Sequence, residues 1–489
     1  MTPSPDSVVR RGPNKLTRAL MALVLAAATL VAASAQHAQA ATTTAGFKGV
    51  NWADQRDNFV NGVLYPSGLS STDTYSSAET VAEQVVGQLD SITGANTVRM
   101  PINEPTVADD WSAYTGAIDG ALTKGKVILA YWAWENGEPD SVSAFDTMWD
   151  TVIAKYGTNA NVYFEVINEP YAYSASALQT FYVNWLARYP SVPVGRVILD
   201  GSGYATGVST VGSDSALNGT LIGAHYYTFF VSSPYNDENQ WANGIASEIG
   251  SYASRTVATE WGAPMSPGSK NGVSYNTIDY SIESGSYFAE YVRGVSSELR
   301  TLGVGSVYWP GLRDGDWYSL TSKTGTGSSI ALSLVNSSGL TRLQYAWGVG
   351  SGGGTYVNIS NDATGLYFDG LGATANGSAT GQYAASGSEN QQWIIVNDGN
   401  YVQLENRATG LYLDGLGLTA NGSIVGQYAD TNSTNQQWTI VSDGNYVLFE
   451  NRATSMYIDG MGRTTNGSDL AQYAYSNSTN QQWKISAAG

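Results

Sequence analysis

Eight short apolar runs alternate with longer amphipathic segments over the part of this chain that precedes residue 350. Runs rich in β-branched and aromatic residues favour strands, whereas apolar residues spaced three and four apart favour helices. Strands that alternate with helices build parallel βαβ units, and eight units in one domain predict an α/β TIM (β/α)8 barrel. A doubly wound open sheet is the alternative, but no phosphate-binding G-x-G-x-x-G follows an early strand.

The predicted strands are 47–52, 96–102, 126–132, 162–168, 196–201, 221–227, 255–261 and 304–310, and examples of the predicted helices are 78–92, 142–156, 175–189 and 284–302.

The sequence pattern changes at a glycine-rich stretch, residues 350–354, after which a repeat begins. The segment G-L-Y-F-D-G at 365–370 returns as G-L-Y-L-D-G at 410–415 and S-M-Y-I-D-G at 455–460. Three copies would not close a β-propeller, whereas they suit a three-fold β-trefoil in which each copy supplies four short strands. We therefore predict a barrel domain over 41–348, a linker over 349–355 and an all-β trefoil domain over 356–489.

Each repeat also carries N-Q-Q-W, at 390–393, 435–438 and 480–483, and these Q-x-W motifs resemble the ricin-type lectin fold and carbohydrate-binding module family 13. The resemblance implies sugar pockets built from an aspartate, an aromatic platform and an amide. The matching residues are Asp369, Tyr383 and Asn390; Asp414, Tyr428 and Asn435; and Asp459, Tyr473 and Asn480. In any one repeat the asparagine alternatively closes a turn. The three Q-x-W tryptophans are expected in the core.

The first forty residues have the pattern of a secretory signal peptide. Four basic residues precede an apolar run at 19–33, and Ala38-Gln39-Ala40 follows as a small-x-small cleavage signature. We predict cleavage after Ala40 and an extracellular protein, with a retained signal anchor as the alternative. No later segment offers 18 uninterrupted apolar residues, so no other membrane span is predicted.

The formal charge of −18 and the absence of cysteine narrow the function further. Nucleic acids and anionic membranes are bound through basic patches, so neither is an expected partner of this acidic chain. A chain without cysteine has no disulfides and no thiolate metal sites. No metal-ligand cluster is visible in the sequence, and we expect no metal or organic cofactor and a monomer that acts on a neutral ligand.

Two glutamates stand where predicted strands end. Glu169 follows the fourth strand in V-Y-F-E-V-I-N-E-P, and Glu260 ends the seventh in R-T-V-A-T-E-W-G. Both therefore lie at the barrel rim where chemistry takes place. Two facing carboxylates are the minimum machinery for glycoside hydrolysis, and their separation decides between retention and inversion. The alternative for Glu169 is an ordinary loop glutamate before a turn.

Residues 45–348 resemble glycoside hydrolase family 5, on several motifs in order. Asn168-Glu169-Pro170 matches the family's acid/base motif, which implies Glu169 as general acid/base and Asn168 as a donor to the sugar 2-hydroxyl. Glu260 matches the nucleophile. Arg99, in N-T-V-R-M-P, matches the arginine that keeps the nucleophile ionised, because an adjacent cation favours a carboxylate. The alternative for Arg99 is a structural ion pair.

The resemblance extends to the sixth and eighth strands. His225 and Tyr227, in H-Y-Y, match a pair that orients the site, and Trp309, in V-Y-W-P, matches the tryptophan under the sugar at the cleaved bond. Both His225 and Trp309 have packing in the core as their alternative.

The third strand departs from the family pattern. Where the family often has an L-D-x-H-like ending, this chain reads L-A-Y-W, with Trp132 in that place and Trp134 two residues later. Indoles in place of an imidazole alter the glycone side of the cleft. They suit the apolar face of a sugar or a flat aglycone, and the alternative is that both pack under a loop.

These observations predict a secreted retaining glycoside hydrolase that cleaves β-glycosidic bonds of plant-derived β-glucosides or β-glycans by a two-glutamate mechanism. Within this class, a diglycosidase that releases the disaccharide from flavonoid rutinosides is the alternative. A non-catalytic secreted lectin is the alternative from another class.

Overall fold

The computed structural model describes residues 44–57, 60–135, 137–270, 272–282, 284–349, 356–398, 401–431 and 433–488. The predicted signal peptide, 1–40, and the glycines of the predicted linker lie outside the described residues. Within these ranges, no helix combines the length and the apolar character that a membrane crossing requires.

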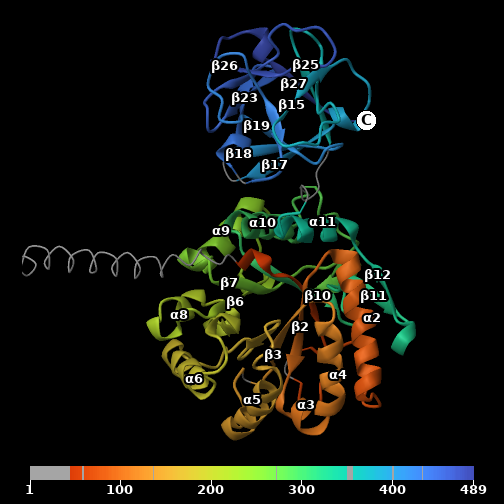
Figure 1. The fold of residues 1–489 in the computed structure, drawn as a ribbon, viewed down its shortest axis with the longest axis vertical. Coiled ribbons are helices and arrows are strands. Elements are labelled where there is room, and N and C mark those ends of the chain that lie inside the picture. The colour runs from red at the N-terminus through yellow and green to blue at the C-terminus, as the bar shows by residue number, and fades with distance from the viewer. Residues whose placement is uncertain are drawn as a thin grey trace, which may run out of the picture. The chain divides into compact units, whose positions relative to one another are not determined.

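Eight parallel strands close into a barrel in the order β1-β10-β7-β6-β5-β4-β3-β2, which confirms the predicted (β/α)8 barrel (Figure 1). Each lies within one residue of a predicted run, except that β4 ends early, at Glu165, and β10 continues to Leu312. The strands are β1 Lys48–Trp52, β2 Thr97–Ile102, β3 Lys126–Tyr131, β4 Val162–Glu165, β5 Val197–Asp200, β6 Leu221–Tyr226, β7 Thr256–Trp261 and β10 Gly305–Leu312.

The barrel interior changes from apolar to polar along the strands. One cluster of buried side chains comes from β3, β5, β7 and β10 and from the residue just before β1: Phe47, Ile128, Ile198, Val257 and Val307. Further towards the carboxyl ends, the buried side chains include ionisable groups such as Arg99, Glu165 and Asp200. Layers of inward-facing side chains are the expected filling of such a barrel, and here the polar layer underlies the rim where sites form.

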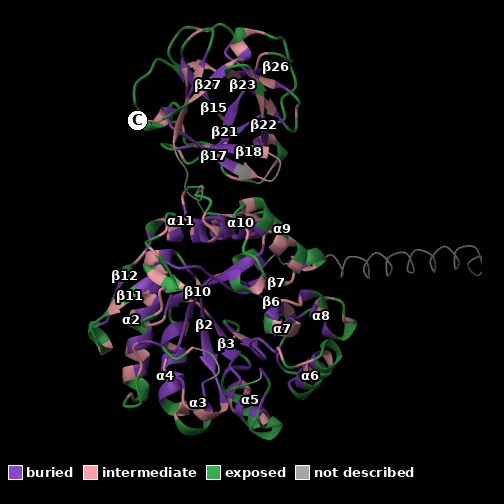
Figure 2. Cartoon of the chain, turned by 180° about the vertical axis from the view of Figure 1, so that it is seen from behind, coloured by how far each residue is buried: buried purple, intermediate pink, exposed green. Residues whose placement is uncertain are grey.

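Helices surround the strands, and their apolar faces meet the outer face of the barrel (Figures 1 and 2). Helix α5 shows why the sequence predicts them. Ser141 caps its first turn by accepting from the Ala144 N–H, and its buried residues recur at helical spacing, from Phe145 and Trp149 to Val152 and Tyr156. The helices are α2 Tyr75–Thr93, α3 Glu104–Asp109, α4 Trp111–Leu122, α5 Val142–Tyr156, α6 Ala175–Arg188, α7 Ser202–Ala205, α8 Val208–Gly212, α9 Glu238–Ile249, α10 Tyr287–Leu302 and α11 Ser337–Ala346.

Short elements extend the connections that follow the strands. The 3₁₀ turn η4 (Thr228–Phe230) follows β6, the hairpin β8 (Gly268–Lys270) and β9 (Val273–Tyr275) follows β7, and the hairpin β11 (Thr321–Thr324) and β12 (Ala331–Leu334) follows β10. Such connections carry the functional groups of a barrel enzyme.

The C-terminal part is an all-β domain with three equivalent units, which confirms the predicted trefoil. Its first and last strands, β13 and β27, pair antiparallel over five residues and close the domain. The strands are β13 Val357–Asn361, β14 Tyr367–Asp369, β15 Ser378–Ala379, β16 Gly381–Tyr383, β17 Trp393–Asp398, β18 Tyr401–Asn406, β19 Tyr412–Asp414, β20 Ser423–Ile424, β21 Gly426–Tyr428, β22 Trp438–Asp443, β23 Tyr446–Asn451, β24 Tyr457–Asp459, β25 Ser468–Asp469, β26 Ala471–Tyr473 and β27 Trp483–Ala487.

The three Q-x-W tryptophans form the centre of the trefoil core, as predicted. Trp393, Trp438 and Trp483 are fully buried, and each indole N–H donates to a backbone carbonyl 25 residues earlier in the chain. A buried indole needs such a partner, so the repeat spacing of the sequence is also the spacing of the hydrogen bonds.

Candidate active site

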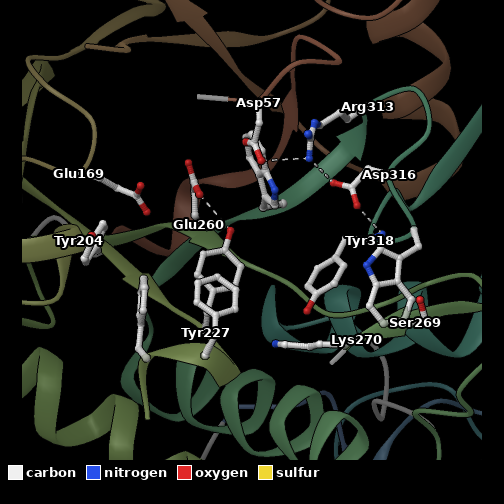
Figure 3. Close-up of a pocket in the computed structure, with 14 residues that line it drawn as sticks. Asp57, Glu169, Tyr204, Tyr227, Glu260, Ser269, Lys270, Arg313, Asp316 and Tyr318 are labelled. Atoms are coloured by element: carbon white, nitrogen blue, oxygen red, sulfur yellow. Dashed lines mark hydrogen bonds and ion pairs between the residues drawn. The ribbon is translucent and has the colours of Figure 1, made fainter. Parts of the chain in front are cut away.

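Glu169 and Glu260 face each other at the carboxyl ends of the barrel strands (Figure 3). Glu260 belongs to β7, and Glu169 lies four residues beyond the end of β4. One carboxylate oxygen of each glutamate and one ring nitrogen of His225 all lie within 4.8 Å of one another. Both glutamates are almost completely buried. Two carboxyl groups this close are characteristic of retaining rather than inverting geometry, for which separations of about 6.5–9.5 Å are usual.

Arg99 connects Glu260 to the polar layer beneath it. Its Nη1 donates to Glu260 Oε1 at 2.5 Å and to Asn51 Oδ1 at 2.9 Å. Its Nε donates to Glu165 Oε2 at 2.7 Å, and its Nη2 donates to Glu165 Oε1 and, at 2.6 Å, to Asn168 Oδ1. Every nitrogen of this buried guanidinium is therefore engaged. Its two glutamates raise the pKa of Arg99 against the opposing effect of burial.

Glu260 is held from both sides. Arg99 binds Oε1, and the Tyr227 hydroxyl donates to Oε2 at 2.9 Å. Burial raises the pKa of Glu260 above its ordinary value, while the Arg99 charge and hydrogen bond act in the opposite direction. The two contacts fix the orientation of the carboxylate and favour its ionised form.

His225 lies beside Glu169 as a neutral imidazole. Its Nδ1 is 3.0 Å from Glu169 Oε1 and 3.6 Å from Glu260 Oε2. Complete burial lowers the pKa of His225 to about 4. A neutral ring adds no positive charge next to Glu169, so it does not favour loss of the proton that a general acid must carry.

Asp200, at the end of β5, positions the backbone of Glu169. Its Oδ2 accepts the Glu169 N–H at 3.0 Å, and Glu169 has a φ of 50°, in the left-handed region that a residue with a Cβ rarely adopts. The same oxygen is 3.8 Å from His225 Nε2. Asp200 is fully buried, and burial together with the nearby Glu165 charge raises its pKa well above the ordinary value. A Cβ at Gly223 would collide with Asp200 Oδ1, so the neighbouring strand leaves room for this carboxyl.

Among the described residues, two sets of three groups have the spacing of metal ligands, although the sequence predicts no such cluster. They are Glu165, Asp200 and His225, and Glu169, His225 and Glu260. Arg99 engages both oxygens of Glu165 and one of Glu260, so a cation already compensates these carboxylates. The chemistry of the residues is therefore that of a proton and charge network.

The two glutamates open into a pocket of about 620 Å³, a volume typical of ligand sites. One side of it is aromatic, with Tyr204 close to Phe230, and Tyr227 stacked on Phe229. Other lining residues are charged: Arg313 pairs with Asp57 and Asp316, and Lys270 lies over the Phe229 ring (Figure 3). The lining residues are Asp57, Glu169, Tyr204, Tyr227, Phe229, Phe230, Glu260, Ser269, Lys270, Trp309, Arg313, Asp316, Trp317 and Tyr318.

The predicted aromatic contacts divide between two pockets. Trp309 lines the pocket that holds the glutamates. Trp132 and Trp134 instead line a second pocket of about 180 Å³. Trp132 is buried and its ring packs against Trp309 at 5.8 Å between centroids, whereas Trp134 is 36% exposed.

The sequence interpretation did not single out Glu165, Asp200 or Asn51. Glu165 lies four residues before Glu169, so on an extended strand it points to the same side, and a carboxylate in a buried strand requires a partner. Asp200 ends the fifth strand at the same rim as Glu169. These two signals were available in the sequence, whereas the contact of Asn51 with Arg99 depends on the register in which β1 pairs with β2.

In the trefoil, the predicted aspartates have the same local structure in all three repeats. Oδ1 of Asp369, Asp414 and Asp459 accepts the N–H of the residue two positions later, at 2.6–2.8 Å. That residue has a positive φ of 53–56° in each repeat. Each aspartate therefore stabilises a tight turn and keeps its second oxygen for other contacts.

The other predicted trefoil residues differ between repeats. Asn390 Oδ1 accepts the Gly372 N–H at 3.0 Å, which is the turn-closing role of the alternative, whereas Oδ1 of Asn435 and Asn480 has no partner among the described residues. The platform tyrosines Tyr383, Tyr428 and Tyr473 lie opposite a tyrosine of the neighbouring strand. Tyr383 is 39% exposed.

Comparison with known proteins assigns the C-terminal part. Residues 344–428 and 434–489 match the family described as ricin-type beta-trefoil lectin domain-like. No curated protein matches the chain. The fold and the family match together define a (β/α)8 barrel followed by a ricin-type β-trefoil lectin domain.

Three solved structures that resemble this chain each cover about a third of it or less. A designed three-fold symmetric protein, ThreeFoil, is 33% identical over 27% of this chain and 96% of its own, with a TM-score of 0.26. A ricin B-like lectin from Macrolepiota procera, in complex with lactose, is 25% identical over 27% of this chain and 94% of its own, with a TM-score of 0.24. An exo-β-1,3-galactanase from Clostridium thermocellum is 24% identical over 33% of this chain and 32% of its own, with a TM-score of 0.27.

Proposed function

We propose that the barrel domain is a retaining glycoside hydrolase that cleaves β-glycosidic bonds. The observation that carries this proposal is the pair of buried carboxylates, Glu169 and Glu260, with oxygens within 4.8 Å at the rim of the barrel. The partners of each carboxylate suit different roles, because Glu169 lies against a neutral imidazole while Glu260 is bound by a guanidinium. An acid and an anion held side by side are the requirement of a double displacement.

In the first step, Glu260 attacks the anomeric carbon and Glu169 transfers its proton to the leaving oxygen. The glycosidic C–O bond breaks as the ester bond to Glu260 forms. In the second step, the ionised Glu169 takes a proton from water, whose oxygen attacks the anomeric carbon and releases Glu260. The products are the free sugar with its original anomeric configuration and the alcohol, and no co-reactant besides water is consumed.

The resemblance of the motifs favours plant-derived β-glucosides or β-glycans as substrates. Within this class, the diglycosidase alternative, in which an intact disaccharide leaves a flavonoid rutinoside, agrees with a pocket that has an aromatic side. The residues that then orient the site and contact the sugar are Arg99, Asn168, His225, Tyr227 and Trp309.

We further infer that the trefoil binds sugars and holds the enzyme on a polymer or a cell surface. Several weak sites on one chain raise the local concentration of the catalytic domain through avidity. Residues 1–40 direct secretion in this proposal, and the predicted boundaries at 348 and 356 separate catalysis from binding. A secreted lectin without activity is the competing function.

A panel of chromogenic β-glycosides tests the proposal. Wild-type protein is expected to release the chromophore, and Glu260→Ala and Glu169→Ala are expected to lower the rate by at least about a thousandfold, because Glu260 forms the ester intermediate and Glu169 activates the water that hydrolyses it. Azide is expected to restore turnover of both variants, with an α-glycosyl azide from the first and a β-glycosyl azide from the second. Equal rates for wild type and Glu260→Ala would contradict the assignment of the nucleophile.

A further inference from the structure

One cation that lines the main pocket has no carboxylate partner among the described residues. Lys270 and Arg313 are the positively charged side chains of the described lining. Arg313 Nη1 lies 3.2 Å from Asp57 Oδ2 and 2.9 Å from Asp316 Oδ2, so two carboxylates balance its charge. The ammonium group of Lys270 instead lies over two aromatic rings, and within the described part of the chain no acidic group is at ion-pair distance. The pocket therefore presents an unbalanced positive charge to a ligand.

The hairpin of β8 and β9 fixes Lys270 at the pocket (Figure 3). A Cβ at Gly268 would collide with the Trp317 ring, so the start of the hairpin packs directly against the loop that follows β10. The Nζ of Lys270 lies 5.0 Å from the centroid of the Phe229 ring and 5.6 Å from that of Phe288. The negative faces of these rings stabilise an ammonium group, and they leave its hydrogen-bond donors for another partner.

The ammonium group of Lys270 also lacks part of its hydration. Its side chain is half-buried, and burial lowers the pKa of Lys270. A charge that is partly removed from water has a free-energy cost, which a neighbouring anion offsets. The catalytic carboxylates have other partners, since Arg99 binds Glu260 and His225 lies against Glu169. A ligand anion at this end of the pocket would therefore supply the compensating charge.

A row of aromatic rings, which we call the aromatic wall, connects the acid/base residue to Lys270. The wall begins directly after Glu169, whose carbonyl accepts the Tyr171 N–H at 2.7 Å. Successive ring centroids along it are 4.8, 5.9 and 5.0 Å apart, and Lys270 lies over the last ring. Because Glu169 gives its proton to the leaving oxygen in the proposed mechanism, the leaving group begins at this residue. In chain of contact, the wall consists of Tyr171, Tyr204, Phe230 and Phe229.

Two rings of the aromatic wall are open to solvent. Tyr204 is 44% exposed and Phe229 is 55% exposed, and both line the main pocket. Exposed rings in a pocket offer a stacking surface to a flat group. A flat leaving group that lies along the wall has its far end near Lys270.

We propose that Lys270 binds an anionic substituent, such as a carboxylate, at the end of the leaving group remote from the glycosidic oxygen. The inference rests on the proposed hydrolase function and narrows its substrates to β-glycosides of flat, negatively charged aglycones. The acidity of the whole chain predicts a neutral ligand, whereas the local charge at Lys270 favours an anion.

Two substrates that differ in one charge test this proposal. They are the β-glycosides of 7-hydroxycoumarin-3-carboxylic acid and of its ethyl ester, with the sugar that wild-type protein cleaves fastest. The ratio of kcat/KM for the acid to kcat/KM for the ester is measured in each variant, so that intrinsic leaving-group reactivity and the folded fraction cancel. Lys270→Met is expected to lower this ratio at least about fivefold, as expected for loss of a contact to a charged group, and Lys270→Arg to keep it within about twofold of wild type.

Lys126→Met is the matched control, because Lys126 also lies over a phenylalanine ring, Phe47, at 5.8 Å, but at the start of β3. We expect the wild-type ratio in this variant. Acid and ester rates that fall by the same factor in Lys270→Met would show that Lys270 only supports the hairpin and would overturn the proposal, as would an unchanged acid rate. Loss of activity on every glycoside in wild-type protein would instead contradict the hydrolase function.

A second pair of substrates places the anion. If the anionic group belonged to the sugar, Lys270→Met would lower the ratio of 4-nitrophenyl β-glucuronide to β-glucoside hydrolysis and not the coumarin ratio. That outcome would overturn the assignment to the leaving group.

A binding measurement requires no turnover and separates the failure of this inference from that of the hydrolase function. Glu260→Gln protein is titrated with free 7-hydroxycoumarin-3-carboxylate and with its ethyl ester, and binding is followed by fluorescence anisotropy. Adding Lys270→Met is expected to raise the Kd of the carboxylate at least about fivefold, and more than that of the ester. Equal Kd values for the carboxylate with and without this substitution would overturn the role of Lys270, whatever the rates are.

Discussion

Replacement of Asp200 tests whether this buried carboxyl positions the acid/base residue. Asp200→Ala removes the acceptor of the Glu169 N–H and leaves that buried donor without its partner. The side chain is fully buried and lines neither of the two pockets described above, so we expect a change in kcat with little change in KM.

The size of the effect follows from two contributions. A buried N–H that loses its acceptor costs about 1–3 kcal/mol. Glu169 has a φ of 50°, and this left-handed conformation costs a residue with a Cβ about 1–2 kcal/mol. Once Asp200 no longer holds the backbone, Glu169 can relax to another conformation and recover this energy. The catalytic conformation is then disfavoured by at least about 2 kcal/mol, which lowers kcat by at least about 30-fold.

Asp200→Asn is the matched control. Burial and the Glu165 charge raise the pKa of Asp200 well above its ordinary value, and an amide oxygen of the same shape can replace the carboxyl oxygen as the acceptor of the Glu169 N–H. We expect kcat within about threefold of wild type for this variant, and thermal melting curves to show that both variants are folded. A kcat of Asp200→Ala equal to wild type would refute the positioning role. Equal losses in both variants would show that an ionised carboxylate is required.

Three further predictions concern ionisation and the trefoil. Because hydrolysis requires ionised Glu260 and burial raises its pKa, kcat/KM is expected to fall with decreasing pH along a limb centred above about 4.3, the ordinary value; a limb centred lower would contradict this environment. In protein that lacks residues 1–40 and any histidine tag, His225 is the only histidine, and its NMR titration is expected to have a midpoint of about 4 rather than about 6.5. Replacement of Asp369, Asp414 and Asp459 together by asparagine keeps the oxygens that close the turns and removes the carboxylates that we expect to bind sugar. We expect this variant to be retained more weakly in gels that contain plant polysaccharides and to hydrolyse small glycosides at unchanged rates. Retention equal to wild type would exclude these residues from binding.

The fold was largely predictable because it repeats simple patterns. Eight apolar runs separated by amphipathic segments leave few topologies besides a closed parallel barrel, and the strands lie close to the predicted positions. The early end of β4, at Glu165, was not predictable, because Val166 still donates to the Ile198 carbonyl at 3.1 Å although regular pairing has ended. The trefoil was predictable from its period, since the Q-x-W tryptophans serve the same core in each repeat.

The site was predictable where a motif coincides with a strand end. Five predicted residues contact one another at the carboxyl ends of the strands, where their positions on the barrel place them: Glu169, Glu260, Arg99, His225 and Tyr227. Contacts that depend on three-dimensional packing were not predictable: the sequence alone does not show that Trp132 is buried against Trp309 while Trp134 is exposed. Likewise, only the geometry distinguishes Asn390, which closes a turn, from its equivalents in the other repeats.

The central claim is a double displacement by Glu169 and Glu260, and the anomeric configuration of the first product tests it most directly. Proton NMR spectra recorded within the first minutes of hydrolysis, on the chromogenic β-glycoside that is cleaved fastest, separate the two anomers before they equilibrate. Carboxylate oxygens within 4.8 Å predict that the β-anomer appears first and that the α-anomer follows only by mutarotation. Initial release of the α-anomer would mean direct attack by water and would contradict the account.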